Sequence, residues 1–270
     1  DALVADEGPD AGDTYFTMFA SIDVKEPNAS GINWTVGSSR DIKFDINGTA
    51  GVDKVDVFYI KTYAVNQGAA CPSVNCVQIA NDVDVTTCRN TPYPTAGCCT
   101  VTWPTVDDAI NSDVRIKVMD WQNGASIYDV SDNSLSIIGG IGVTAPTAAQ
   151  IVRIQQSPAF NITWTNSGNI RTGHCPADDG GTPAVDESLC LEIRLATDGT
   201  NFTTLLASNQ DSTAGAKSYS WTPAAATAQV ATAKVRVQVP ASATVLDPGA
   251  SQAAGLRSER PNTSLSGRGS

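Results

Sequence analysis

The chain has 270 residues, a formal net charge of -11 and a sequence pI of about 4.4. This length suits one large domain or two of ordinary size, and an acidic chain is a poor partner for the phosphate backbone of nucleic acid. No apolar run approaches the roughly 18 residues that a membrane-spanning helix needs. Because the first residue is Asp1 and not Met, we expect a processed or excised form.

The residue pattern predicts an all-β fold. No segment keeps an apolar period of 3.6 residues over several turns, whereas alternation with a period of two recurs. Phe160, Ile162 and Trp164, for example, alternate with the polar residues Asn161 and Thr163. Strands with one buried and one wet face are typical of antiparallel sandwiches.

The first predicted element is a junction at residues 13–24, D-T-Y-F-T-M-F-A-S-I-D-V, and a similar junction recurs at residues 132–143, D-N-S-L-S-I-I-G-G-I-G-V. In the later copy, Leu135 and Ile137 should end one sandwich, and Ile141 and Val143 should begin the next. In the earlier copy, Ile22 and Val24 should begin the first sandwich. The residues before them would then form a strand with no preceding domain in this chain: Tyr15, Phe16, Met18 and Phe19.

Several further segments recur in the same order. Residues 42–44 match 162–164, residues 95–105 match 213–223, and residues 114–118 match 235–239. The spacing between partners is 118 to 121 residues, which indicates an internal duplication. About seven short strands per repeat predict two tandem immunoglobulin-like or fibronectin-III-like antiparallel β-sandwiches. We expect an extension with a donor-type strand at 1–18, a first domain with a Cys-rich insertion at 19–140, a second domain at 141–255 and a polar tail at 256–270.

The repeats resemble a known module. The pattern P-x-x-x-G-x-x-W-x-V-G-S lies at 27–38, I-x-W at 162–164, G-x-x-S-Y-x-W-x-P at 215–223 and V-R-I-x-V at 114–118. It is similar to the Ig-like repeats of fungal Ser/Thr-rich cell-wall proteins and of prokaryotic cell-surface and filament proteins. The resemblance implies a surface location and a structural or binding role, and the family pattern brings no catalytic motif.

Seven cysteines favour an oxidising compartment and disulfide bonds. Cys175 and Cys190 bracket a polar loop, and a bridge there would close about 16 residues and stabilise the fold by roughly 3 kcal/mol. Cys71–Cys76 is the candidate for the matching bridge. Cys88 would pair with Cys98 or Cys99, which leaves one thiol over. This thiol would be inert and buried, would form an intermolecular disulfide or, least favoured, would bind zinc.

Six N-x-S/T sequons add to the argument for an extracellular, cell-surface glycoprotein. The candidate glycosylation sites are Asn28, Asn33, Asn47, Asn161, Asn201 and Asn262.

The second domain lacks an obvious last strand, because the chain after residue 247 shows no apolar alternation. An unfinished sandwich leaves an open core groove and unpaired edges. We therefore predict donor-strand complementation: residues 13–19 of one subunit fill the groove of the next, and the subunits form a head-to-tail homopolymer. Two alternatives remain, a second domain that finishes itself with residues 262–266, and a piece of a longer tandem array. A filament of this kind could serve adhesion, cohesion or protection.

Catalysis is not expected, since His174 is the one histidine and no catalytic motif is present. We expect no cofactor and no structural metal, with weak Ca²⁺ binding by Asp107-Asp108 or Asp178-Asp179 as the alternative. The expected partner is the protein itself, and neither nucleic acid nor a membrane. Glycans or other surface proteins are a second candidate class, with Trp121 and Trp34 as the aromatic residues that could stack on sugars.

Overall fold

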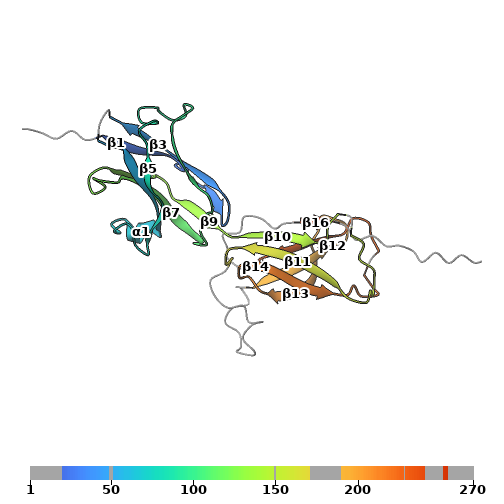
Figure 1. Ribbon diagram of the computed structural model, residues 1–270. Coiled ribbons are helices and arrows are strands. Elements are labelled where there is room, and N and C mark those ends of the chain that lie inside the picture. The colour runs from blue at the N-terminus through green and yellow to red at the C-terminus, as the bar shows by residue number, and fades with distance from the viewer. Residues whose placement is uncertain are drawn as a thin grey trace, which may run out of the picture.

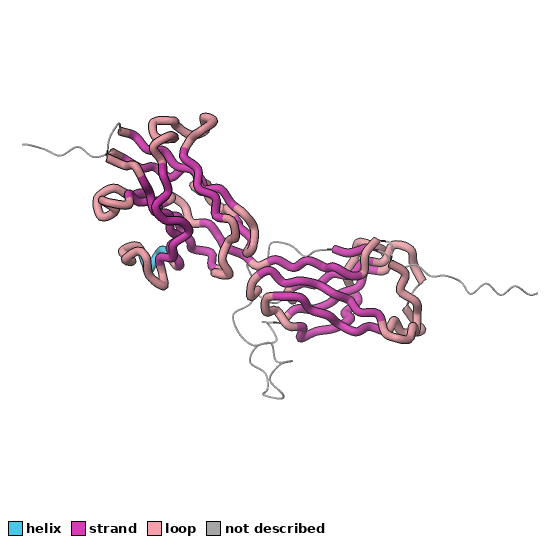
Figure 2. Tube along the Cα trace, viewed as in Figure 1, coloured by secondary structure: helices cyan, strands magenta, loops and turns pink. Residues whose placement is uncertain are grey.

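The computed structural model describes residues 20–48, 51–148, 150–170, 190–227 and 229–240, and the backbone of 252–254. Within these residues the chain forms two β-sandwiches placed end to end (Figure 1). Strands and loops make up nearly all of the described residues, which include one short helix, α1 (Tyr63–Asn66), in the first sandwich (Figure 2). The proposed donor strand, at residues 13–19, lies outside the described residues.

The first sandwich consists of two sheets that face each other. One sheet has the order β1 (Ser21–Glu26), β3 (Arg40–Asn47), β6 (Cys99–Trp103). The other has the order β2 (Asn33–Thr35), β9 (Leu135–Ile138), β7 (Asn111–Asp120), β4 (Lys54–Lys61), β5 (Cys76–Asp84), and β8 (Tyr128–Val130) also pairs with β7. Every pairing is antiparallel except that of β2 with β9, which is parallel. This strand order is that of an immunoglobulin-like sandwich.

The second sandwich repeats this plan, with fewer strands among its described residues. One sheet has the order β10 (Gly140–Ala145), β11 (Phe160–Ser167), β14 (Gly215–Trp221). The other has the order β13 (Thr204–Gln210), β12 (Leu191–Ala196), β15 (Lys234–Gln238), β16 (Gln252–Ala254). Together the sandwiches confirm the prediction of an all-β chain built from two tandem Ig-like units.

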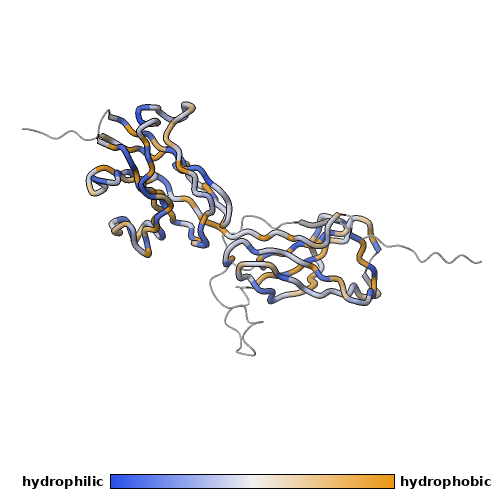
Figure 3. The backbone as a smooth tube through the Cα atoms, viewed as in Figure 1, coloured by the Kyte–Doolittle hydropathy of each residue, from blue (hydrophilic) through white to orange (hydrophobic). Residues whose placement is uncertain are grey.

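Each sandwich has its own hydrophobic core between its two sheets. In the first, Trp103 stacks on Tyr59 with ring centroids 4.8 Å apart, and Trp34 meets Trp103 edge to face at 6.1 Å. In the second, Ile162 and Trp164 are buried as their alternation predicts. Apolar and polar residues alternate along the strands of both units (Figure 3). Burial of these alternating side chains is the main force that fixes each strand's register.

The structure shows one further correspondence between the two units that the sequence does not show clearly. Gly37 donates its N–H to the carbonyl of Val106, and Gln155 donates its N–H to the carbonyl of Pro223. Both donors have a positive φ, +80° for Gly37 and +54° for Gln155. The loop after β6 in the first unit and the loop after β14 in the second are therefore held by the same backbone hydrogen bond. Its donor is a glycine in one unit and a glutamine with left-handed backbone in the other.

Asp198 and Gly199 lie in the loop of the hairpin between β12, which ends at Ala196, and β13, which begins at Thr204. The Asp198 carboxylate accepts N–H groups from Asn201 at 2.7 Å and from Thr200 at 2.9 Å. These donors favour the charged form, and they lower the pKa of Asp198 to about 2. The aspartate therefore organises the loop, and Gly199 supplies a positive φ of +78°.

A small second core lies on the outer face of β4. Phe58 and Ile60 alternate with Val57 and Tyr59, so they point away from the main core, yet both are 1% exposed. The insertion between β4 and β5 covers them with Tyr63, Ala69, Cys71 and Cys76, joined by Met119 of β7. A Cys71–Cys76 disulfide fastens this cover. Strand β4 is therefore buried on both faces.

Removal of the Cys71–Cys76 bond should destabilise the first sandwich. The double variant Cys71→Ser/Cys76→Ser frees a short loop and loosens the cover over Phe58 and Ile60, so we expect a loss of about 2 kcal/mol in the free energy of unfolding. Chemical denaturation followed by circular dichroism measures this loss. Cys98→Ser is the matched control, because Cys98 is a free thiol and its substitution should leave the midpoint unchanged. Equal midpoints for the double variant and the wild type would contradict the role of the cover.

Candidate functional site

The link between the two sandwiches is one residue long. Strand β9 ends at Ile138 and β10 begins at Gly140, so the last strand of one unit continues almost directly into the first strand of the next. A Cβ atom at Gly139 would lie 2.9 Å from Ile170 and 3.2 Å from Ile110. Glycine is therefore needed here because the two units pack closely around the link.

A polar clamp holds the same joint. The Asp108 carboxylate, in the loop between β6 and β7, accepts the backbone N–H of Asn169 at 3.0 Å and its side-chain amide at 2.7 Å. Gly168 precedes Asn169 at φ +77°, and a Cβ atom there would lie 2.8 Å from Asp108 and 2.9 Å from Val36. Hydrogen bonds to a charged acceptor are stronger than neutral ones, so this contact restricts how the two units turn against each other.

The last strands of the two units differ sharply in residue type. In the first unit, Leu135 of β9 lies opposite Val114 of β7. In the second unit, Ala253 of β16 lies opposite Val235, which the repeat aligns with Val114. The position of the last strand is thus taken by Gln-Ala-Ala where the first unit has Leu-Ser-Ile-Ile.

This finding corrects the expectation that the chain after residue 247 supplies no last strand. Three residues do pair with β15, and they come earlier than the alternative at 262–266, which lies outside the described residues. The sequence does not predict this strand, because residues 252–254 have no apolar alternation. Backbone pairing alone places it at the edge of the sheet.

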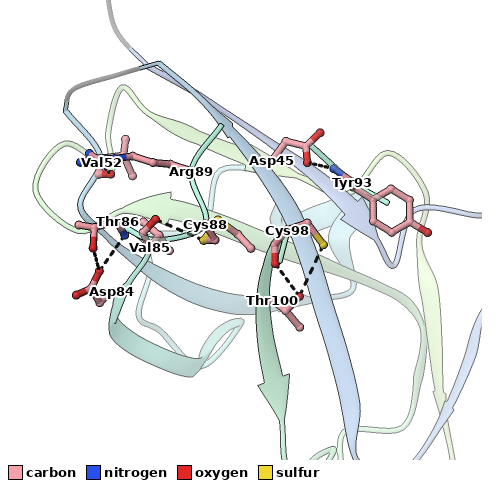
Figure 4. The surroundings of a disulfide bond; sticks show 11 residues. Asp45, Val52, Asp84, Val85, Thr86, Cys88, Arg89, Tyr93, Cys98 and Thr100 are labelled. Carbon is pink, nitrogen blue, oxygen red and sulfur yellow. Dashed lines mark hydrogen bonds between the residues drawn. A yellow bond between two sulfur atoms is a disulfide. The ribbon is translucent and has the colours of Figure 1, made fainter. Parts of the chain in front are cut away.

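The cysteines form the bonds that their number suggests. Besides Cys71–Cys76, Cys88 bonds to Cys99, and Cys190 is also in a disulfide, while its predicted partner Cys175 lies outside the described residues. Among the described cysteines, Cys98 is the free thiol, half-buried, with its Sγ 3.9 Å from the hydroxyl of Thr100 (Figure 4). Its neighbour Cys99 is 1% exposed, as expected for adjacent residues on opposite faces of a strand.

One detail of the cysteine prediction is wrong. Cys76 begins β5, whereas Cys190 precedes β12. Strand β12 is equivalent to β4, because β12 pairs with β15, β4 pairs with β7, and the repeat aligns β15 with β7. The Cys71–Cys76 bond is therefore not the counterpart of a bond at Cys190. The similarity of V-Q-I-A to L-E-I-R reflects strand alternation and not a shared position.

The sequons fall into two groups. Asn33, Asn47 and Asn161 are exposed, and their side-chain amides have no hydrogen-bond partner within the described part of the chain. The Asn28 amide donates to Asp132 at 2.8 Å, and the Asn201 amide donates to Asp198 at 2.5 Å, so both already have a partner. Asn262 lies outside the described residues. Three of the described sequons thus have exposed amides without a protein partner, and at Asn28 and Asn201 a glycan would replace a hydrogen bond to a carboxylate.

The acidic residues considered for Ca²⁺ have other partners. Asp107 accepts the hydroxyl of Tyr59 at 2.9 Å, and burial together with this bond raises the pKa of Tyr59. Asp108 is used in the clamp to Asn169. Asp178-Asp179 and His174 lie outside the described residues. Within the described ranges, no group of three His, Cys, Asp or Glu side chains is placed to hold a metal ion.

Of the two tryptophans considered for sugar stacking, one is unavailable. Trp34 is only 6% exposed and packs against Trp103 in the core, so that interpretation was wrong for Trp34. Trp121 is 51% exposed in the loop between β7 and β8. It borders a hollow of about 230 Å³ whose other lining residues are Gly51, Asp53, Lys54, Asp120 and Gln122.

Comparisons with known proteins add little beyond the fold. No protein-family model and no curated protein matches the chain. Among solved structures, fibronectin(III)-like modules of Clostridium thermocellum CbhA are similar at 13% identity over 87% of this chain and 94% of that one, with a TM-score of 0.24. A titin A168–169 structure is similar at 14% identity over 87% and 96%, with a TM-score of 0.33.

A third similar structure contains Ig1-Ig2 of Dpr2 in complex with Ig1-Ig3 of DIP-Theta, at 9% identity over 87% of this chain and 64% of that one, with a TM-score of 0.25. TM-scores this low carry no argument about function, and the Ig-like assignment rests on the strand order described above. Ig-like modules with disulfide bonds are typical of secreted or extracellular proteins. In the described part of the chain, no helix has the length and hydrophobicity to cross a lipid bilayer.

Gly168→Ala should loosen the joint between the units. The new Cβ atom would collide with Asp108 and Val36, so the clamp to Asn169 must open. Gly31→Ala is the matched control, because Gly31 has nearly the same φ, +76°, with nothing within 4 Å of its Cβ position. Both variants carry backbone strain on the order of 1 kcal/mol. Small-angle X-ray scattering should show a wider spread of interdomain orientations for Gly168→Ala alone, and identical scattering for the two variants would contradict the clamp.

Proposed function

We propose that the chain is a structural subunit of an extracellular filament or cell-surface appendage, polymerising head to tail by donor-strand complementation. The observation that carries the proposal is the contrast between the last strands of the two units. Leu135 and Ile137 complete the first core, whereas Gln252, Ala253 and Ala254 take the corresponding place in the second. A better strand from another subunit could replace the latter.

The chain contains one further copy of the strong strand pattern. Residues 16–19, F-T-M-F, align with β9, L-S-I-I, at a spacing of 119 residues, and Ala20 then aligns with Gly139. Strand β9 already fills the last-strand position of the first sandwich. A strand at 16–19 would therefore serve a sandwich other than the one it leads into.

The repeat also defines the register of the proposed pairing. Because Phe16 aligns with Leu135, and Val235 aligns with Val114, Phe16 of one subunit should lie opposite Val235 of the next. Phe16 would thus replace Ala253, and burial of a large apolar side chain contributes roughly 1.5–3 kcal/mol. Main-chain hydrogen bonds to β15 would be kept, since one edge strand replaces another.

The geometry of such a contact favours a filament. The strand precedes β1, which begins at the end of the first unit that points away from the second (Figure 1). The receiving position, beside β15, belongs to the second unit. A contact between two different surfaces at opposite ends of a subunit does not close on itself, so it repeats without limit. The resemblance to surface-protein repeats and the disulfides support an extracellular location.

Substitution of the strand should abolish filaments. We expect full-length protein to form filaments in negative-stain electron microscopy, and Phe16→Asp/Met18→Asp to remain short particles, because charged residues cannot enter the core. Phe16→Leu, which copies the residue of β9, is the matched control and should assemble.

A converse variant tests the competition between strands. Ala253→Leu/Gly255→Ile gives the second unit an apolar last strand of its own, which should outcompete the donor and yield monomers.

Filaments from Phe16→Asp/Met18→Asp would mean that assembly uses another surface. Monomers from the wild type would rule out the filament and leave the stalk module of a larger surface protein.

Carbohydrate binding is the second candidate function, and the exposed Trp121 beside a hollow of about 230 Å³ favours it. An aromatic face next to polar side chains is a common way to hold a sugar. Retention on a glycan panel that is lost on Trp121→Ala would support this function. Absence of retention by the wild type would dismiss it.

A further inference from the structure

The two ends of the first sandwich have different surroundings. The leading end carries the start of β1 and the ends of β3 and β7, as the pairs Ser21 with Asn47 and Val55 with Asp120 establish. The trailing end carries the loop at 104–110 and the turn at 36–39, and it contacts the second sandwich through Val36 and Asp108. The leading end is where Trp121 lies, since Trp121 directly follows β7.

The second sandwich uses its own leading end to contact the first. Gly168 and Asn169 follow β11, as Gly48 follows β3, and both glycines have a positive φ, +77° and +127°. At this end a Cβ atom on Gly140 would lie 3.1 Å from Thr35 of the first sandwich. Within the chain, therefore, a leading end docks onto a trailing end. The corresponding corner of the first sandwich lies at Ala20 and Gly48, and Trp121 borders a hollow at this end together with Gly51. A contact of the same kind between subunits would therefore bring the Trp121 surface against the trailing end of a second sandwich.

Trp121 is held in place although it is exposed. Its backbone N–H donates to the carbonyl of Lys54 at 3.1 Å, and the Lys54 ammonium lies 5.6 Å from the ring centroid and 2.7 Å from Asp82. The next turn is fixed by Asp120, 2% exposed, whose carboxylate accepts the N–H and the side-chain amide of Asn123. A rigid aromatic side chain loses little conformational freedom on binding, which is why tryptophan is common among residues that dominate interfaces.

At the trailing end of the second sandwich, small apolar residues stand where the first sandwich has carboxylates, and Arg153 and Gln155 are exposed beside them. The shared turn aligns Val106 with Pro223, so Asp107, Asp108 and Ala109 are replaced by alanines at positions 224–226, all three exposed. The same turn aligns Val36 with Ile154, which is partly exposed. Among its described residues, 153–156 and 222–227, this surface has no carboxylate to repeat the clamp to Asn169. Its alanines are small apolar residues on which an indole ring can pack.

We propose that the leading end of the first sandwich, centred on Trp121, docks onto the trailing end of the second sandwich of another copy, at residues 154 and 224–226. This inference rests on the proposed head-to-tail function and names the surface that supports the strand exchange. The joint inside a subunit combines a polar clamp with apolar packing around Gly139, whereas the joint between subunits is an apolar contact without the clamp.

The experiment compares Trp121→Ala with Tyr128→Ala in the full chain. Tyr128 is the matched control, because it is 50% exposed, follows the same loop and also lies beneath a lysine, Lys117 at 4.4 Å. Trp121→Ala should raise the concentration needed for filaments by about tenfold or more, as expected when a central aromatic anchor is lost. Tyr128→Ala should leave it unchanged, and Ala225→Asp on the opposite surface should act like Trp121→Ala.

Iodide quenching of tryptophan fluorescence gives a second readout. The other four tryptophans are at most 6% exposed, so the quenchable emission comes from Trp121. Assembly should protect it. If Trp121→Ala forms filaments at the wild-type concentration, the docking proposal is overturned, whereas the donor-strand proposal is not affected.

Failure of the donor strand can be told apart from failure of the docking. If the wild type forms no filaments, protection of Trp121 from iodide quenching at rising protein concentration still supports the docking contact. Absence of this protection overturns the docking proposal. Retention on a glycan panel that depends on Trp121, without any such protection, would assign the surface to sugars and also overturn the proposal.

Discussion

The structure depends on a single-residue link between two sandwiches. Because only Gly139 separates β9 from β10, the strand that closes one core and the strand that opens the next form an almost continuous segment. The direction in which the first unit ends therefore sets the direction in which the second begins. Close packing of Ile110 and Ile170 around Gly139 adds a steric restriction. The clamp from Asp108 to Asn169 adds a directional polar restriction.

Much of the fold could be predicted from the sequence, because alternation is a direct consequence of burying one face of a strand. Ile162 and Trp164 are buried as expected, and the junction at 132–143 separates into β9 and β10 as expected. The short strand β16 could not be predicted, because Gln-Ala-Ala carries no apolar period. The burial of Phe58 and Ile60 on the outer face could have been suspected from the unbroken run V-F-Y-I, which is unusual for a strand with one wet face.

The candidate site was harder to predict than the fold. Sequence alone placed Trp34 and Trp121 in one class, and only tertiary packing separates them, since Trp34 meets Trp103 and Trp121 meets solvent. The role of Asp108 depends on a residue 61 positions away in the chain. Pairing of Cys88 was left open between two neighbours. Cys99, which begins β6 and faces the core, takes it, whereas Cys98 precedes the strand and is a free thiol. Such assignments require knowledge of which loops meet at one end of a sandwich, and composition and spacing do not contain it.

The parallel pairing of β2 with β9 has a consequence for tension along the chain. Strand β2 lies near the start of the first sandwich and β9 at its end, and the pairing extends from the bond between Ser136 and Ile32 to the bond between Val36 and Ile138. A pull on the two ends of the unit slides these strands along each other, so the hydrogen bonds bear the load together and do not open one after another. In the second sandwich, β16 pairs with β15 alone among the described strands. Under load, the first sandwich should therefore be the mechanically stronger unit and the second the one that yields.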